Sequence, residues 1–195
     1  IALDVNLHFV EGYKNTGFKA MLACNFKKDA IRYQKCFEQF GDLTTAVVIS
    51  APDMREGATE VDESNDDLVV SYWNKMMKQY GDADTYVEAM KNKFCDGEID
   101  ILIVCSKLLT GFDAPVCQIL YIDKELKEHG LLQAIARTNR LREGKEYGLI
   151  IDYRGLIQKL DTAMDMYSGA GLENFEDGDL KGVVVDVLDA VGQLR

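Results

Sequence analysis

The residues best suited to chemistry are a glutamine and two arginines in the stretch HGLLQAIARTNRLR, residues 129–142. At about 100° per residue along a helix, Gln133, Arg137 and Arg140 fall within about 60° of one another. The opposite side carries residues suited to packing on a sheet: Leu131, Ile135 and Thr138. Two guanidinium groups directed at one point favour an anion such as a triphosphate. The ordinary alternative for an Arg-x-x-Arg helix is a solvated basic face.

A second candidate lies in ILIVCSKLLTGFDAP, residues 101–115, where an apolar strand runs into a loop. In open α/β sheets, ligands bind beyond the carboxyl ends of the strands. Gly111 permits a close approach of the backbone to a ligand, and the carboxylate of Asp113 is suited to accepting a ribose hydroxyl. Taken alone, Gly-Phe-Asp-Ala-Pro is also an ordinary turn.

The elements that must position these residues are five short apolar strands alternating with helices. The predicted strands are Lys19–Cys24, Ala46–Ser50, Ile99–Ser106, Gln118–Asp123 and Tyr147–Asp152. The predicted helices are Lys27–Phe40, Asn65–Tyr80, Thr85–Cys95 and Leu131–Leu141. Nearly continuous apolar runs are typical of strands covered on both faces. The alternation therefore predicts an α/β fold with a parallel, doubly wound sheet.

Several segments lie outside this pattern. Pro52–Asp67 is acidic with few apolar residues and is expected to be a solvated loop. Gly155–Tyr167 is expected to be an amphipathic helix leaving the sheet. Gly169–Gly182 contains four glycines among acidic residues and is expected to separate the core from a last helix, Val183–Leu194.

The composition limits the class of protein. The 195 residues carry 22 basic and 33 acidic side chains, a formal charge of −11. A domain that binds nucleic acid alone usually has a basic footprint, so any polyanion contact is expected to be local or shared with another domain. The five scattered cysteines predict reduced, mostly buried thiols rather than zinc ligands or disulfides. No apolar run reaches the ~18 residues of a membrane span, and no signal peptide pattern opens the chain, so a cytoplasmic location is expected.

Other motifs are missing or misleading. The sequence contains no Gly-x-x-x-x-Gly-Lys-Ser/Thr loop and no Asp-Glu-x-His element. Asp123 and Asp152 imitate Walker B strands but are interpreted as ordinary strand ends. Pro52-Asp53 and Glu143-Gly144-Lys145 imitate a nuclease motif but are far apart in the sequence.

Together, the two candidate stretches resemble motifs V and VI of superfamily 2 helicases. QAIARTNR follows the pattern Gln-x-x-Gly-Arg-x-x-Arg, with Ala136 in place of the glycine. LLTGFDAP, DKELKEHGLLQAIARTNR and KEYGLIIDYRG resemble closely the restriction (R) subunit of type I restriction enzymes. KAMLACNFKKDAIRYQKCF resembles motif IV, so the resemblance spans about Lys19–Gly155.

The resemblance implies a RecA-like second helicase lobe at residues 19–155. An N-terminal extension, residues 1–18, precedes this lobe, and residues 156–195 are expected to be the start of a helical region. It identifies Arg140 with the arginine finger and Arg137 with a second arginine near the γ-phosphate, the two catalytic positions. The implied ATP-binding residues are Gly111, Asp113, Gln133, Arg137 and Arg140. The implied DNA-binding residues are Asn25, Ser106, Lys107 and Thr110. No metal ligand is expected. Cys105 and Ser106 depart from the Thr-Asp found in many helicases, which weakens the DNA-contact assignments.

The implied function is that of the second motor lobe of an ATP-dependent DNA translocase in a type I restriction endonuclease. ATP and Mg²⁺ would be bound mainly by a first lobe that this chain lacks. The implied partners are double-stranded DNA, the first lobe and nuclease domain of the full-length chain, and the methylation and specificity subunits, without a membrane. The chain begins at Ile1 and is expected to be a piece of a longer protein, inactive on its own. The alternatives are lobe 2 of another superfamily 2 DNA or RNA helicase, or a non-catalytic α/β interaction module.

Overall fold

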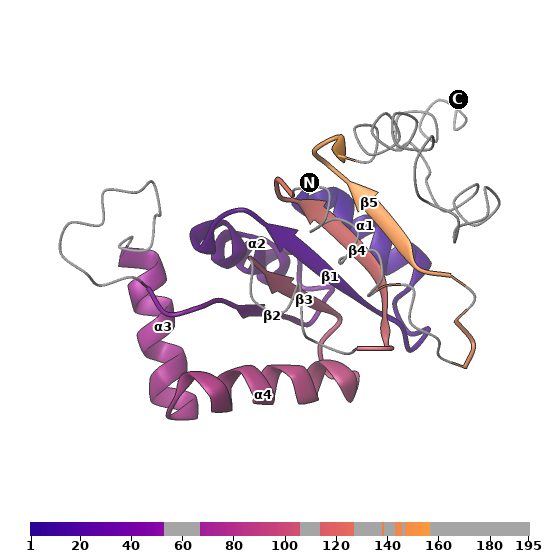
Figure 1. Cartoon of the computed structure of the whole chain (residues 1–195). Coiled ribbons are helices and arrows are strands. Elements are labelled where there is room, and N and C mark those ends of the chain that lie inside the picture. Colours follow the sequence, from indigo (N-terminus) through magenta and orange to yellow (C-terminus); the bar gives the residue numbers. More distant parts are fainter. Residues whose placement is uncertain (53–66, 106–113, 127–137, 139–142, 146, 157–195) are drawn as a thin grey trace, which may run out of the picture.

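A computed structural model of the chain describes residues 1–52, 67–105, 114–126, 138, 143–145 and 147–156 (Figure 1). The helices within these residues are α1 (Ala2–Gly12), α2 (Lys27–Phe40), α3 (Asp67–Tyr80) and α4 (Ala83–Cys95). The strands are β1 (Lys19–Cys24), β2 (Thr45–Val48), β3 (Ile101–Val104), β4 (Cys117–Asp123) and β5 (Leu149–Asp152). None of the helices described is long and apolar enough to cross a membrane.

The five strands form one sheet in the order β2-β3-β1-β4-β5, and every neighbouring pair is parallel. The register aligns Ala23 of β1 with Val104 of β3 and with Ile122 of β4. Parallel pairing requires crossover connections, which is why helices separate most strands in the sequence. The predicted parallel α/β sheet is confirmed.

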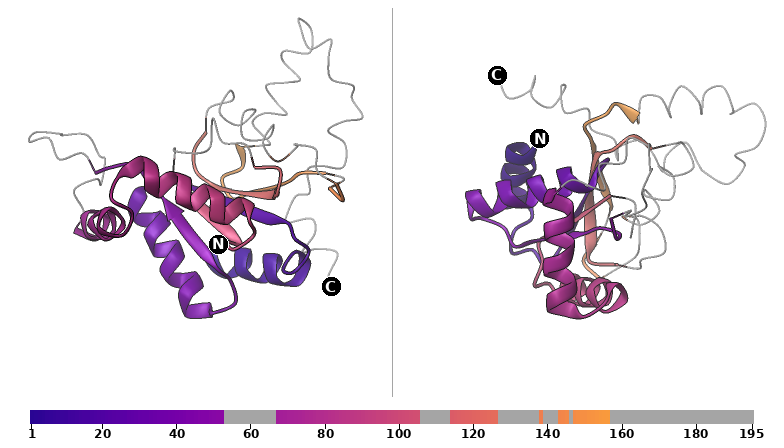
Figure 2. Two further views of the ribbon diagram at one scale, coloured as in Figure 1. Left: turned by 90° about the horizontal axis from the view of Figure 1, so that it is seen from below. Right: turned by 90° about the vertical axis from the view of Figure 1, so that its left-hand side faces the viewer.

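Both faces of the sheet carry buried side chains, with α1 and α2 on one face and α3 and α4 beside β2 and β3 on the other (Figure 2). On one face, residues such as Leu22 and Ile103 pack with Phe9 of α1 and Phe37 of α2. On the other face, residues such as Leu102 and Leu120 pack with side chains of α3 and α4. This two-sided burial explains the continuous apolar runs in the strands.

Local sequence signals account for the ends of the helices. Asp82 caps α4, since its Oδ1 accepts hydrogen bonds from the backbone N–H groups of Asp84 and Thr85, both at 2.9 Å. Gly41 ends α2 with a φ of 76°, a left-handed conformation that glycine adopts at low cost.

Strand β2 lies at an edge of the sheet, where backbone groups lack a strand partner. The carbonyl of Val47 instead accepts hydrogen bonds from the hydroxyls of Tyr86 and, at 3.4 Å, Tyr72. Trp73 packs edge-on against Tyr86 with ring centroids 6.3 Å apart. An aromatic cluster from α3 and α4 therefore covers this edge.

Among the described residues, the predicted elements agree with the structure except at the N-terminus. β1 and α2 have the predicted bounds, and the other strands differ by a few residues at their ends. α1 was not predicted, although its Val5 and Phe9 are fully buried in the same cluster as the sheet. Of the predicted helix Leu131–Leu141 only Thr138 is described, and it is helical. Residues 53–66 of the acidic loop and 157–195 of the predicted helical extension lie outside the described residues.

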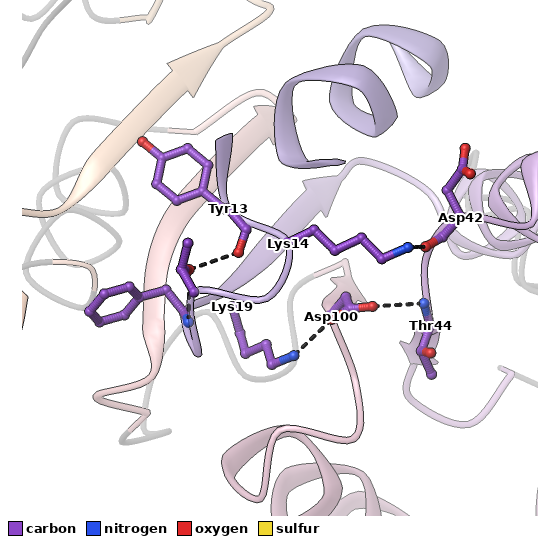
Figure 3. A network of polar contacts seen from close by, with 8 residues as sticks. Tyr13, Lys14, Lys19, Asp42, Thr44 and Asp100 are labelled. Atoms are coloured by element: carbon purple, nitrogen blue, oxygen red, sulfur yellow. Dashed lines mark hydrogen bonds and ion pairs between the residues drawn. The ribbon is translucent and has the colours of Figure 1, made fainter. Parts of the chain in front are cut away.

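At the amino-terminal edge of the sheet, charged groups are satisfied within the protein (Figure 3). The Asp100 carboxylate pairs with Lys19 Nζ at 2.7 Å and accepts the backbone N–H of Thr44 at 3.0 Å. Lys14 donates a hydrogen bond to the carbonyl of Asp42. These contacts join the starts of β1, β2 and β3, so this edge is an internally paired network.

Candidate functional site at the carboxyl edge of the sheet

The carboxyl ends of all five strands lie along one edge of the sheet, because every pairing is parallel. Asn25 follows β1 after Cys24, and Ser106 follows Cys105 at the end of β3. Because β1 and β3 are neighbours with Ala23 opposite Val104, the segments that start at Asn25 and Ser106 leave the sheet from adjacent positions. The topology therefore brings the ends of β1 and β3 together, directly before Asn25 and Ser106 in the sequence.

Asn25 is the one predicted DNA-binding residue that the structure describes. Its Oδ1 accepts a hydrogen bond from the backbone N–H of Glu125 at 3.0 Å, which ties the end of β1 to the segment after β4. Its Nδ2 donates to none of the residues that the structure describes. The side chain is partly exposed, so the amide nitrogen is in a position to serve a ligand at this edge.

Asp123, at the end of β4, has one hydrogen bond to Oδ2 and an ion pair at Oδ1, although Oδ1 accepts no hydrogen bond among the described residues. The Tyr33 hydroxyl of α2 donates to Asp123 Oδ2 at 2.5 Å, and Arg154 Nε lies 2.7 Å from Oδ1 in an ion pair. Burial, together with the hydrogen bond to Asp123, raises the pKa of Tyr33 well above its ordinary value of 10.0. These contacts agree with the interpretation of Asp123 as a structural strand end rather than a metal-binding carboxylate.

Asp152, at the end of β5, also has a structural role. Its Oδ1 accepts the backbone N–H of Arg154 at 2.8 Å, and its Oδ2 accepts the backbone N–H of Leu156. Within the described parts of the chain, no group of three or more His, Cys, Asp or Glu gathers as a metal site.

Lys145 belongs to the Glu-Gly-Lys sequence that imitates a nuclease motif. Its side chain is buried, and Nζ donates to the carbonyl of Cys117 at 2.7 Å, at the start of β4. Glu143 is exposed. Lys145 thus anchors its segment to the amino end of β4, on the side of the sheet away from the candidate site.

Thr138, within the motif VI stretch, is 2% exposed. It packs directly against Gly148, just before β5: a Cβ added to Gly148 would lie 2.3 Å from the carbonyl oxygen of Thr138 and 2.8 Å from its Cβ. Contacts this short do not occur between real side chains, so only glycine fits here without a shift of the backbone. The burial of Thr138 agrees with the expectation that its side of the stretch faces the sheet.

Sequence reasoning did not identify Gly148 as important. The available signal was an isolated glycine at the start of the apolar run YGLIIDY, which often marks a close approach of two backbones. The partner of that approach is ten residues earlier, and no periodicity indicates it.

The remaining predicted site residues lie outside the described residues. They are Ser106, Lys107, Thr110, Gly111, Asp113, Gln133, Arg137 and Arg140. None of the five cysteines, all of which are described, forms a disulfide, and Cys24, Cys105 and Cys117 are buried, as predicted for most of the thiols.

Known proteins with similar sequences share one description. Residues 16–155 match the family model of type I restriction enzyme subunit R domain 3. A Methanocaldococcus jannaschii protein named as the MjaVIIP endonuclease subunit of a type I restriction enzyme is 34% identical over 193 residues, covering 94% of this chain and 17% of the relative. A Staphylococcus saprophyticus type I restriction enzyme endonuclease subunit is 50% identical over 74 residues, covering 37% of this chain and 8% of the relative. The chain thus spans about a sixth or less of these relatives.

Solved structures with the same fold include helicase lobes. A fragment of an HsdR subunit of a type I restriction enzyme from Vibrio vulnificus YJ016 has a TM-score of 0.52 at 20% identity, covering 82% of this chain and 28% of that one. The C-terminal domain of the DEAD-box protein Dbp5 has a TM-score of 0.51 at 14% identity, covering 87% of this chain and 81% of that domain. The fold is that of a RecA-like helicase C-terminal lobe, and the chain belongs to the family of type I restriction enzyme R subunits, in which it corresponds to domain 3.

Proposed function

We propose that this chain is the second motor lobe of an ATP-dependent DNA translocase in a type I restriction endonuclease R subunit. Membership of the R subunit family and the helicase-lobe fold support this function. The observation that carries it is the burial of Thr138 against Gly148. On the helix predicted from the sequence, Thr138 would lie opposite Gln133, Arg137 and Arg140, so its burial favours an outward direction for those three side chains.

In this proposal Arg140 is the arginine finger and Arg137 contacts the γ-phosphate beside it. Guanidinium groups suit this role because they stay charged and bind phosphate oxygens through paired hydrogen bonds. Gln133 holds the two arginines in place, and Gly111 and Asp113 lie near the nucleotide sugar. ATP and Mg²⁺ are held mainly by the preceding lobe, so hydrolysis depends on closure of the two lobes.

Contacts with the DNA backbone are assigned to Asn25, Ser106, Lys107 and Thr110. The adjacent exits of β1 and β3 support this grouping, since they start the Asn25 and Ser106 segments side by side. The charge of −11 makes a broad electrostatic attraction to DNA unfavourable. Binding at this edge therefore rests on a few directed donors, with the remaining affinity supplied by other domains of the complete subunit.

The complete enzyme needs more than this chain. The nuclease domain and the first motor lobe belong to the full-length subunit, and the methylation and specificity subunits select the DNA. We expect the 195-residue chain alone neither to hydrolyse ATP nor to cleave DNA, because it contains no phosphate-binding loop.

The proposal is tested by Arg140→Ala in the complete enzyme. Removal of an arginine finger typically lowers the rate by about 10³–10⁵, so DNA-stimulated ATP turnover should fall by at least about 10³ while ATP binding, measured by fluorescent nucleotide titration, is retained. The matched control is Arg32→Ala, since the Arg32 side chain on α2 is 60% exposed and pairs only with Asp29 among the described residues. Normal turnover in Arg140→Ala would refute the finger assignment.

A further inference from the structure

Two buried thiols lie side by side at the carboxyl edge of the sheet. Cys24 is the last residue of β1, and Cys105 directly follows β3. Their Sγ atoms are 3.7 Å apart, and both side chains belong to the hydrophobic cluster beneath α1 and α2. The pair therefore shares one face of two neighbouring strands.

The backbone geometry is compatible with a bond between the two sulfurs. Neighbouring strands are about 4.8 Å apart, and disulfides span Cα separations of about 4.4–6.8 Å. The aligned pair Ala23 and Val104 places the next residues, Cys24 and Cys105, opposite one another. Closing the gap from 3.7 Å to a bond of about 2.05 Å requires side-chain rotation and little strand movement.

The surroundings give the two thiols different pKa values and different exposure. The pKa of Cys105 is lowered, first because its sulfur accepts a hydrogen bond from Cys24 and then because the cations of Lys124 and Lys27 lie nearby. The same hydrogen bond and burial raise the pKa of Cys24. Cys105 retains 7% exposure whereas Cys24 is fully buried. Cys105 is therefore the thiol that deprotonates more readily and that a small oxidant reaches first, with Cys24 as its resolving partner.

We propose that Cys24 and Cys105 form a redox-sensitive pair that hydroperoxides oxidise to a disulfide, and that the disulfide form of the enzyme has lower DNA-dependent ATP turnover. The second half of this proposal rests on the motor function proposed above.

The chemistry takes two balanced steps. The Cys105 thiolate attacks one oxygen of hydrogen peroxide, the O–O bond breaks, and hydroxide leaves, so the sulfur becomes a sulfenic acid and the peroxide is reduced. The Cys24 sulfur then attacks Cys105 Sγ and displaces the hydroxyl group, which leaves as water with the thiol proton. The net reaction converts two thiols and one peroxide into one disulfide and two waters. A dithiol reductant reverses it by exchange.

The disulfide would act on the candidate site through the chain itself. Asn25 and Ser106, two of the proposed DNA contacts, are the residues that directly follow Cys24 and Cys105. The disulfide would link the residues that precede both segments, and would therefore restrict the movement of β1 and β3 relative to each other. We therefore expect oxidation to change the DNA dependence of turnover more than the binding of ATP.

The test uses the complete enzyme treated with hydrogen peroxide. Peptide mass spectrometry without reduction should find the Cys24 and Cys105 peptides linked, and DNA-stimulated turnover should fall at least fivefold and recover with dithiothreitol. In Cys105→Ser, the linked peptide should be absent and peroxide should cause no comparable fall. The matched control is Cys95→Ser, which removes an exposed cysteine and should leave both effects intact.

Each outcome decides a different point. Absence of the linked peptide in oxidised wild-type enzyme overturns the redox pair, whatever happens to the variants. A linked peptide with unchanged turnover overturns the regulatory half. If the reduced enzyme shows no DNA-dependent turnover at all, the motor function itself fails, while the mass measurement still decides whether the disulfide forms.

Discussion

His8 joins α1 to the sheet through a polar contact. Its Nδ1 lies 2.7 Å from the hydroxyl of Tyr121 on β4, and nearby Asp4 accepts a hydrogen bond from Tyr153. Burial lowers the pKa of His8 below its ordinary value of 6.5, and the negative charges of Asp4 and Glu11 oppose this only in part. Folding therefore favours the neutral imidazole.

The lowered pKa gives a pH dependence with a definite sign. Just below pH 6.5 the unfolded chain binds more protons at this site than the folded chain, so the free energy of unfolding decreases as the pH falls through this range. His8→Gln, which does not titrate, should reduce this slope between about pH 7 and pH 5. Urea unfolding of both proteins across that range measures the effect, and equal slopes would contradict it.

Among individual residues, the sequence predicts which side chains suit phosphate and DNA but not which contacts support them. The arginines and Gln133 stand out because their charge and spacing are unusual. Gly148 does not stand out, because its importance depends on how closely another segment packs against it. A Cβ added to Gly148 would lie 2.3 Å from the carbonyl oxygen of Thr138. Such close approaches arise from tertiary packing, which spacing along one chain does not encode.

At the scale of elements, apolar patterning predicted most of the fold. β1 and α2 are as predicted because a continuous apolar run and a 3.6-residue period are unambiguous there. α1 was missed because Leu3, Val5, Leu7 and Phe9 alternate with other residues, as in a half-buried strand. In the structure Val5 and Phe9 are buried, whereas Leu3 and Leu7 are 56% and 48% exposed. The buried residues have the spacing of a helix, whereas the apolar residues of the sequence alternate as they do in a strand.

The junction between β5 and the motif VI stretch yields a prediction at this scale. Gly148→Ala would force the backbone of Thr138 to move. Arg137 and Arg140, which are one and two residues from Thr138 in the sequence, would then move with it. A displacement of about 1 Å at a catalytic group can cost about 10²-fold in rate. In the complete enzyme we expect kcat for DNA-stimulated ATP hydrolysis to fall about 10- to 100-fold, with the KM for ATP and the melting temperature little changed.

The matched control for this substitution is Gly12→Ala. A Cβ at Gly12, the last residue of α1, would meet nothing within 4 Å. Its turnover should equal that of the wild-type enzyme. If Gly148→Ala turned over normally, or lost activity only through lower stability, Gly148 would have no role in positioning the arginines.

At the scale of the whole molecule, the two edges of the sheet differ. The amino edge is closed by the paired charges of Lys19, Asp100 and their neighbours. The carboxyl edge carries the exits of all five strands, including Asn25 with a free amide donor among the described residues. A parallel sheet with both faces covered leaves this edge as the place for a ligand or a neighbouring domain. The acidic charge and the small share of its relatives that the chain covers fit a lobe that acts with others.

The central claim is that the two arginines project toward a nucleotide held by the preceding lobe. The most direct measurement is an experimental structure of the complete subunit with DNA and a non-hydrolysable ATP analogue. We expect the guanidinium groups of Arg137 and Arg140 to lie within about 3 Å of γ-phosphate oxygens, with Thr138 buried against Gly148 on the opposite side. Arginine side chains directed away from the carboxyl edge, or held in ion pairs unrelated to the nucleotide, would contradict the account.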